Sequence, residues 1–303
     1  TTEIYTLSLH DALPILRLEA NTNGDIHLAY RSLASLRGNL TVESGANRIK
    51  IAEGNGKLLI DGNQNQTITH DNRWNAVSID TYNLEINKPA GRVLLSTELN
   101  MTHQLTLTNG IVNVFDDGLV KIADNATVTG ASNASYIFGK VNKRGNTDFT
   151  FPVGAGNQFR PLQITAPSGV YNLTAEFLSR QNRYGAVIQN CTQVSSCENW
   201  ELTNGGGDVT FNTAISNENS CETTATNPAL MVQNGQEWSV LGSTTDATGK
   251  FWEADAAVTS KGNKLTIITP GEQKDAGTIS QLSSLTDDTY RFFIPTNSSF
   301  TYT

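Results

Sequence analysis

The feature that most constrains this chain is a short string of alternating apolar and polar residues, repeated many times and followed each time by Gly, Asn or Asp. Between residues 40 and 128 these strings are three or four residues long and recur mostly at spacings of about 7 to 12 residues. Alternation with a period of two, bounded by turn residues, predicts β-strands. A chain of many short strands is expected to be all-β, either a β-sandwich or a parallel β-solenoid.

Two observations favour a parallel β-solenoid for residues 16–143. The strands are very short, and no helical stretch or long crossover interrupts them. In a solenoid each coil buries its inward side chains against the next coil, so the pattern must continue over several coils. Asn at the turns is also consistent with a solenoid, because Asn tolerates a left-handed backbone conformation and its side chain can form ladders between coils.

The sequence changes in character beyond residue 143. The strings become longer and more aromatic, and at least seven of them, separated by turn clusters, predict a β-sandwich over residues 144–303. The charge also divides the chain there. Residues 16–143 hold 12 basic and 12 acidic side chains, whereas residues 144–303 hold 9 basic and 15 acidic ones.

Residues 1–15 (TTEIYTLSLHDALPI) resemble the in-frame translation of a sequencing-library adapter. This resemblance predicts that they are an artefact joined to a truncated, metagenomic reading frame, with any natural signal peptide lost upstream. The alternative is a genuine N-terminal strand over residues 4–9, which have β character.

Charge and hydropathy limit the partners of the chain. Its formal net charge is −8, which disfavours a nucleic-acid or anionic-lipid surface. No run of about 18 apolar residues occurs, so the sequence predicts no membrane insertion.

Seven phrases together resemble large secreted surface proteins of Bacteroidota-type bacteria, many of them adhesin-like and associated with type IX secretion. The phrases are LTLTNGIVNV (105–114), ATVTG (126–130), SYIFGKVNKRG (135–145), FTFPVG (149–154), FRPLQITAP (159–167), SCENWEL (196–202) and NSC (219–221). In that family a β-helical region precedes a β-sandwich module. The resemblance implies an extracellular or outer-surface location and a structural or adhesive role.

The three cysteines are Cys191, Cys197 and Cys221. The resemblance implies a disulfide between Cys197 and Cys221, because the family carries this pair in the same two phrases. A bond between Cys191 and Cys197 is the alternative. No Cys-x-x-Cys pair occurs and no His is near, so no zinc site is predicted.

The best local group of candidate ligand-binding residues is His70, Asp71, Arg73 and Trp74. On an exposed loop, an aromatic ring, a cation and a carboxylate would bind a sugar by stacking and hydrogen bonds. The same residues also fit an ordinary solvated turn with Trp74 returning to the core. Trp200 lies in an alternating string and is predicted to be buried rather than part of a carbohydrate-binding face.

An enzyme is the alternative function, because parallel β-solenoids host polysaccharide lyases and hydrolases. Such sites need clustered carboxylates, or Ca²⁺ with a nearby cation. Asp61, Asp71 and Asp80 recur at spacings of ten and nine, and Asp116, Asp117 and Asp124 form a second acidic group. Carboxylates at turns more often cap the turns. We therefore expect no catalytic residue, metal or other cofactor, with Ca²⁺ supported by no pattern.

The sequence thus predicts a fragment of a secreted, non-enzymatic cell-surface protein. It would act as a structural or adhesive scaffold, and its partners would be extracellular polysaccharides or cell-surface glycans.

Overall fold

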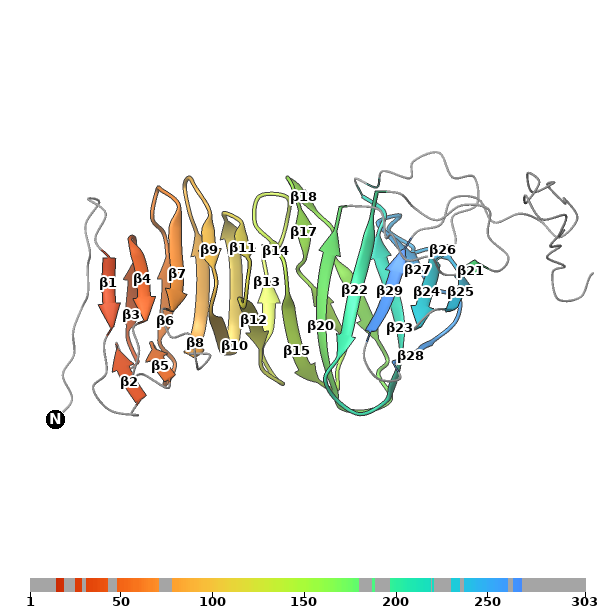
Figure 1. The fold of residues 1–303 in the computed structure, drawn as a ribbon, viewed down its shortest axis with the longest axis horizontal. Coiled ribbons are helices and arrows are strands. Elements are labelled where there is room, and N and C mark those ends of the chain that lie inside the picture. Colours follow the sequence, from red (N-terminus) through yellow and green to blue (C-terminus); the bar gives the residue numbers. More distant parts are fainter. Residues whose placement is uncertain are drawn as a thin grey trace, which may run out of the picture.

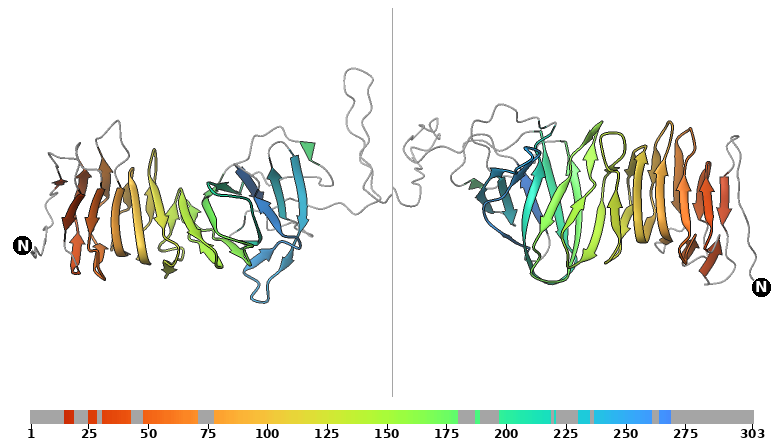
Figure 2. Two further views of the ribbon diagram at one scale, coloured as in Figure 1. Left: turned by 90° about the horizontal axis from the view of Figure 1, so that it is seen from below. Right: turned by 180° about the vertical axis from the view of Figure 1, so that it is seen from behind.

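The short strings form parallel strands stacked along one axis (Figures 1 and 2). The structure, a computed structural model, describes residues 15–18, 25–28, 31–42, 48–70, 78–179, 187–188, 197–218, 220, 230–234, 237–260 and 264–268. The regular elements of these residues are all strands, and a parallel β-solenoid of about four turns spans residues 33–143. The predicted all-β solenoid is therefore confirmed.

The coils of the solenoid build three faces. The first is a parallel sheet of β1 (Ile15–Leu18), β4 (Asn39–Val42), β7 (Gln66–His70), β9 (Val93–Leu95), β11 (Val112–Val114) and β14 (Ile137–Phe138). Two long strands, β8 (Ser78–Asn87) and β10 (Glu98–Asn109), run from the second face into the third. The second face adds β2 (Asp25–Leu28), β5 (Arg48–Ile51), β12 (Leu119–Ile122) and β15 (Val141–Gly145), and the third adds β3 (Leu33–Leu36), β6 (Lys57–Ile60) and β13 (Thr127–Thr129).

Inward side chains stack in columns that run along the solenoid. On the second face Ile49 pairs with Ile79, Ile79 with Leu99, Leu99 with Val120, and Val120 with Val141. Each of these side chains is at most 1% exposed. The pairing makes successive coils 20 to 30 residues long. Each coil therefore excludes water from its neighbours, which is the main source of stability in such a stack.

Asn side chains connect successive coils at the turns and at the starts of strands. The Asn39 Oδ1 atom accepts the Thr67 backbone N–H at 2.8 Å, one coil further along. The Asn65 Oδ1 atom accepts the Arg92 backbone N–H at 2.9 Å in the same way. Turn backbone groups that would lack a partner are thereby satisfied.

The second face of the solenoid continues into antiparallel strands. On one side β15 pairs in parallel with β12, and on the other it pairs antiparallel with β20 (Tyr171–Leu178). The sheet then continues through β22 (Asn199–Asn204), β29 (Lys264–Ile268), β24 (Leu230–Asn234), β25 (Glu237–Gly242) and β21 (Val187–Ile188).

The remaining strands form two further sheets. The larger contains β16 (Phe149–Phe151), β19 (Leu162–Thr165), β23 (Val209–Ser216), β27 (Phe251–Glu253), β26 (Thr244–Thr245) and β28 (Val258–Ser260). The smaller pairs β17 (Gly154–Ala155) with β18 (Gln158–Phe159).

One hydrophobic core runs through both halves of the chain. Buried residues from Leu36 in the first described coils to Val258 in the antiparallel part form a single cluster. The expected boundary between residues 143 and 144 falls inside β15, which belongs to the sheet on both sides. Trp200 is completely buried, as predicted. The β-sandwich expected for residues 144–303 is not confirmed and stays a prediction.

Candidate functional site

A pocket opens where the third face of the solenoid is interrupted. Val128 of β13 lies eight residues after Val120, and Phe149 of β16 lies eight residues after Val141, the register partner of Val120. Phe149 thus follows the second face at the same sequence distance as Val128. A strand at Phe149 would be expected to lie next to β13 on the third face, one coil further along. Among the described strands, however, β13 pairs only with β10, and β16 pairs only with β19. The two strands are separated instead of forming a ladder.

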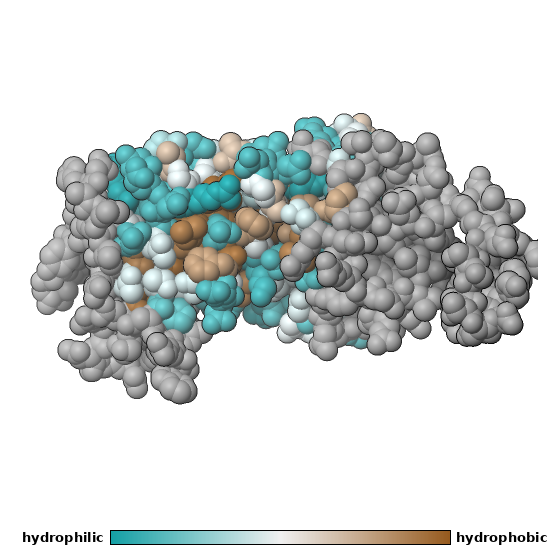
Figure 3. Space-filling view, turned by 45° about the horizontal axis from the view of Figure 1, so that its top comes forward, coloured by the Kyte–Doolittle hydropathy of each residue, from teal (hydrophilic) through white to brown (hydrophobic). Residues whose placement is uncertain are grey.

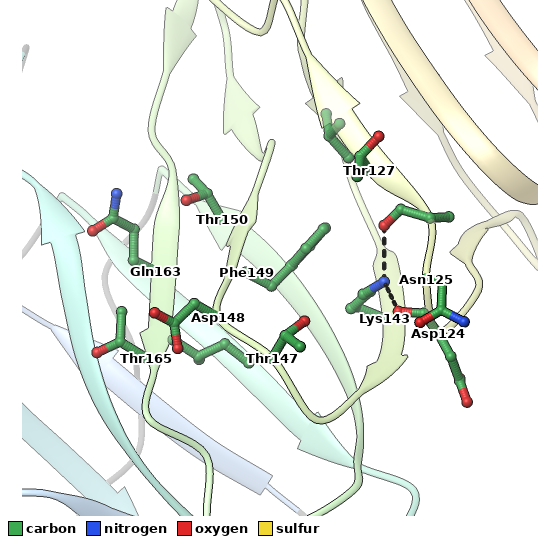
Figure 4. A pocket seen from close by; sticks show the side chains of 13 residues that line it. Asp124, Asn125, Thr127, Lys143, Thr147, Asp148, Phe149, Thr150, Gln163 and Thr165 are labelled. Carbon is green, nitrogen blue, oxygen red and sulfur yellow. Dashed lines mark hydrogen bonds between the residues drawn. The ribbon is translucent and has the colours of Figure 1, made fainter.

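We call this opening the junction pocket, lined by residues 124–128, 143, 147–150 and 163–165, with a volume of about 620 Å³. Figure 4 shows Asn125 and Lys143 on the solenoid side, Gln163 and Asp148 on the opposite side, and Phe149 between them. The lining combines carboxylates, amides and hydroxyls with one aromatic ring. Such a set can accept and donate hydrogen bonds around a polar ligand.

Lys143 forms the floor of the junction pocket on the solenoid side. It occupies an inward position, following Met101 and Ile122 in one column, and its side chain is 1% exposed. Its Nζ atom donates to the backbone oxygens of Ala123 at 2.5 Å, Asp124 at 2.8 Å and Ala126 at 2.9 Å. The ammonium group is thus held by the turn before β13, and it also lies 5.1 Å from the centre of the Phe149 ring, which lines the pocket.

Contacts to the antiparallel part hold the loop before β16 away from β13. The Tyr171 hydroxyl donates to the Thr147 backbone oxygen at 2.8 Å, and the Asp148 Oδ1 atom accepts the Ala166 N–H at 2.8 Å. Burial, with smaller contributions from Asp148 and Asp124, raises the pKa of Tyr171 to about 12. The hydroxyl therefore keeps its proton and stays a donor at physiological pH.

Titration of Lys143 should make stability depend on pH. Burial lowers its pKa from 10.5 to about 8, and attraction to Asp124 opposes part of this shift. Between about pH 8 and 10.5 the unfolded chain therefore binds more protons at this site than the folded chain, so this site makes the free energy of unfolding rise with pH. Denaturant unfolding measures the free energy of unfolding of wild type and of Lys143→Met across this pH range. The wild-type free energy minus that of the variant should increase as the pH rises.

The matched control for that experiment is Lys140→Met, since Lys140 is exposed on the same segment. Its difference from wild type should stay constant over the same pH range. A Lys143 difference that is flat, or that falls with rising pH, would contradict the lowered pKa.

The sequence-predicted group at His70 is only partly described. His70 ends β7 and is partly buried, and its Nδ1 atom has no hydrogen-bond partner among the described residues. Asp71, Arg73 and Trp74 lie outside the described residues. Whether these four side chains form one site therefore stays a prediction.

The predicted disulfide is described at one end. Cys197 is disulfide-bonded, while Cys221 and Cys191 both lie outside the described residues. The choice between the two pairings stays a prediction.

Asp61 and Asp80, two of the acidic residues considered for the enzyme alternative, each contact a neighbouring coil. Asp61 accepts hydrogen bonds from Ser35 Oγ at 2.8 Å and Arg37 Nε at 3.3 Å, one coil earlier. Asp80 accepts the Asn100 Nδ2 group at 2.9 Å. Asp61 follows β6 of the third face, whereas Asp80 lies on the second face in β8. Asp71 lies outside the described residues. Within the described ranges no group of three His, Cys, Asp or Glu side chains could hold a metal ion.

On the face shown in Figure 3, polar residues surround an apolar patch over the middle of the solenoid. Ion pairs join neighbouring coils on this surface, including Lys57–Glu85 at 2.8 Å and Lys121–Glu98 at 2.6 Å. Among the residues that the structure describes, no helix is long and apolar enough to cross a lipid bilayer.

Sequence reasoning missed most of the junction pocket. It named Asp124 only as part of a weak acidic group, and it did not consider Asp148 or Gln163. No fixed offset between the second and third faces could have located Phe149, because the step from one face to the other is nine residues from Ile49 to Leu58 but six from Leu99 to Leu105. The separation of Phe149 from Val128 follows from contacts made by Tyr171 and Ala166, which no local pattern predicts.

Comparisons with known protein families, with curated proteins and with solved structures found no match to this chain.

Proposed function

We propose that this protein is a non-enzymatic scaffold on a cell surface. It would hold a recognition face away from the cell and adhere to glycans. The observation that carries the proposal is the unbroken core and sheet from the solenoid into the antiparallel strands. A stack in which each coil is packed and hydrogen-bonded to the next is stiff along its axis. Stiffness of this kind serves a spacer.

The use of the polar side chains also supports a scaffold. Asp61, Asp80 and Glu98 each contact a neighbouring coil, so these carboxylates stabilise the stack. The clustered carboxylates that a polysaccharide lyase or hydrolase requires would have to come from elsewhere.

Adhesion is tested by binding of residues 16–303 to a glycan array and to insoluble polysaccharides. We expect retention on at least one neutral polysaccharide with no release of product. Complete absence of binding would leave only a spacer. Release of oligosaccharides from pectin- or alginate-like polymers, abolished by Asp71→Ala or Arg73→Ala, would instead establish the enzyme alternative.

A further inference from the structure

We propose that the junction pocket is a binding subsite for a neutral sugar residue of a polysaccharide. The inference rests on the proposed adhesion to glycans and assigns it to one place in the fold. The volume of about 620 Å³ lies within the range of about 300–1,000 Å³ typical of small-molecule sites. A single sugar unit with its neighbours exposed fits an open pocket of this kind.

The first support is the availability of the lining side chains. Within the described ranges, the side chains of Asn125, Thr150 and Gln163 make no hydrogen bond. Elsewhere in the solenoid, Asn and carboxylate side chains are used to bridge coils, as Asn39 and Asp80 show. These three side chains of the junction pocket are therefore polar groups that the fold itself does not use.

The second support is the backbone on both sides of the pocket. β13 and β16 both line the pocket, and each has one edge without a partner among the described strands. The N–H and C=O groups on these edges offer further donors and acceptors. A sugar hydroxyl group can bind either kind, because it both donates and accepts hydrogen bonds.

The third support is the charge of the lining. Asp124 and Asp148 present carboxylates, and Asp124 also lies 3.8 Å from the exposed Arg144 Nε atom. The Lys143 ammonium group donates to the turn carbonyls and lies 5.1 Å from the centre of the Phe149 ring, so it is one cation beside two carboxylates. Carboxylates accept hydrogen bonds strongly from hydroxyl donors and repel anions. The pocket therefore favours a neutral sugar over a uronic acid.

Phe149 is half-buried, in edge contact with Phe151 and with the Lys143 Nζ atom 5.1 Å from its ring centre. The part of the ring that these contacts leave open supplies an aromatic surface for the apolar side of the sugar ring.

An extended peptide inserted between the two edges fits less well. β13 and β16 are three residues long each, so an inserted strand would gain only a few ladder bonds on either side. Main-chain bonds supply most of the affinity in strand addition, so short edges disfavour it.

The test uses the full chain and isothermal titration calorimetry. The probes are neutral hexa-oligosaccharides of glucose, mannose and galactose, with hexagalacturonate and hexathreonine as the acidic and peptide alternatives. We expect a neutral probe to bind, and Asp148→Asn and Gln163→Ala each to raise its Kd at least tenfold. Asn at position 148 can still accept the Ala166 N–H, so the loop should keep its place. Circular dichroism and unfolding midpoints check that the variants fold.

The matched controls are Asp208→Asn and Gln158→Ala, which make the same changes at exposed positions outside the pocket and should bind as wild type. Neutral binding that the pocket variants leave unchanged would overturn this assignment while leaving glycan adhesion in place. Failure of every sugar to bind would overturn adhesion as well. Binding of hexagalacturonate or hexathreonine alone would overturn the neutral-sugar assignment.

Discussion

Replacing Glu198 with Ala should lower the free energy of unfolding by about 3–5 kcal/mol, because it leaves the charge of Arg160 buried without its partner. Arg160 is completely buried and Glu198 is 2% exposed. Their Nη2 and Oε2 atoms are 2.5 Å apart. A guanidinium stays charged inside a protein, so the variant could not escape the cost by losing a proton.

The surroundings of this ion pair show why water cannot replace the carboxylate easily. The Arg160 guanidinium lies 5.1 Å from the centre of the Trp200 ring and 5.6 Å from that of Phe177. The second carboxylate oxygen of Glu198 accepts the Ser220 hydroxyl at 2.7 Å. Arg160 also donates to the backbone oxygen of Glu218, and its own backbone oxygen accepts the Trp200 indole N–H at 2.8 Å. The pair thus connects the segment between β18 and β19 with the residue before β22 and with Glu218 and Ser220.

Guanidinium chloride unfolding of wild type and Glu198→Ala measures this effect, provided that the slope with denaturant is unchanged. The control is Lys250→Ala, which removes an exposed ion pair with Glu218 at 3.8 Å and should cost less than about 1 kcal/mol. The double variant Arg160→Met with Glu198→Met should recover part of the loss, because it removes both buried charges. A Glu198→Ala loss as small as that of the control would contradict a tightly coupled pair.

The stacked strands were predictable because the solenoid is a local structure repeated. Each coil buries residues that alternate within three or four positions, and its turns use Asn and Gly, so short-range patterns suffice. The column of Ile49, Ile79 and Leu99 can be read as apolar residues with a polar residue directly before and after each of them. The Asn bridges could be anticipated for the same reason.

What escaped prediction depends on contacts between distant coils. Lys143 follows Val141 at an inward position, where alternation alone would call for an apolar residue. Its role depends on three backbone oxygens in an earlier turn, which sequence spacing does not identify. The junction pocket likewise depends on Tyr171 and Ala166, which bond to the loop before β16. Tyr171 lies more than twenty residues beyond its partner in that loop, and Ala166 lies more than fifteen residues beyond its own.

Lys88 is a second buried lysine, and Lys88→Met should lower the free energy of unfolding by about 3–5 kcal/mol, since a buried acceptor without a donor costs about 1–3 kcal/mol. The Lys88 Nζ atom donates to the backbone oxygens of Gly62 at 2.7 Å and Gln64 at 2.8 Å, and to Gln66 Oε1 at 2.6 Å. Met keeps most of the side-chain volume, so the loss reports mainly the missing donors rather than a cavity.

Gln66 extends the effect of Lys88 to the preceding coil. Its Nε2 group donates to the backbone oxygens of Leu36 and Gly38, both at 2.8 Å, while its Oε1 atom accepts from Lys88 and from the Gly62 N–H. The two side chains thus satisfy the inner carbonyls at one corner of consecutive coils. Substituting both should show a coupling of about 0.5–3 kcal/mol, because each holds the other in place.

Urea unfolding of Lys88→Met, Gln66→Leu and the double variant tests this corner. The control is Lys57→Met, which removes a partly exposed ion pair with Glu85 on the same solenoid and should cost less than about 1 kcal/mol. If Lys88→Met cost no more than the control, water would have to satisfy the three acceptors. The corner would then be open to solvent, and the lysine would not hold the coils together.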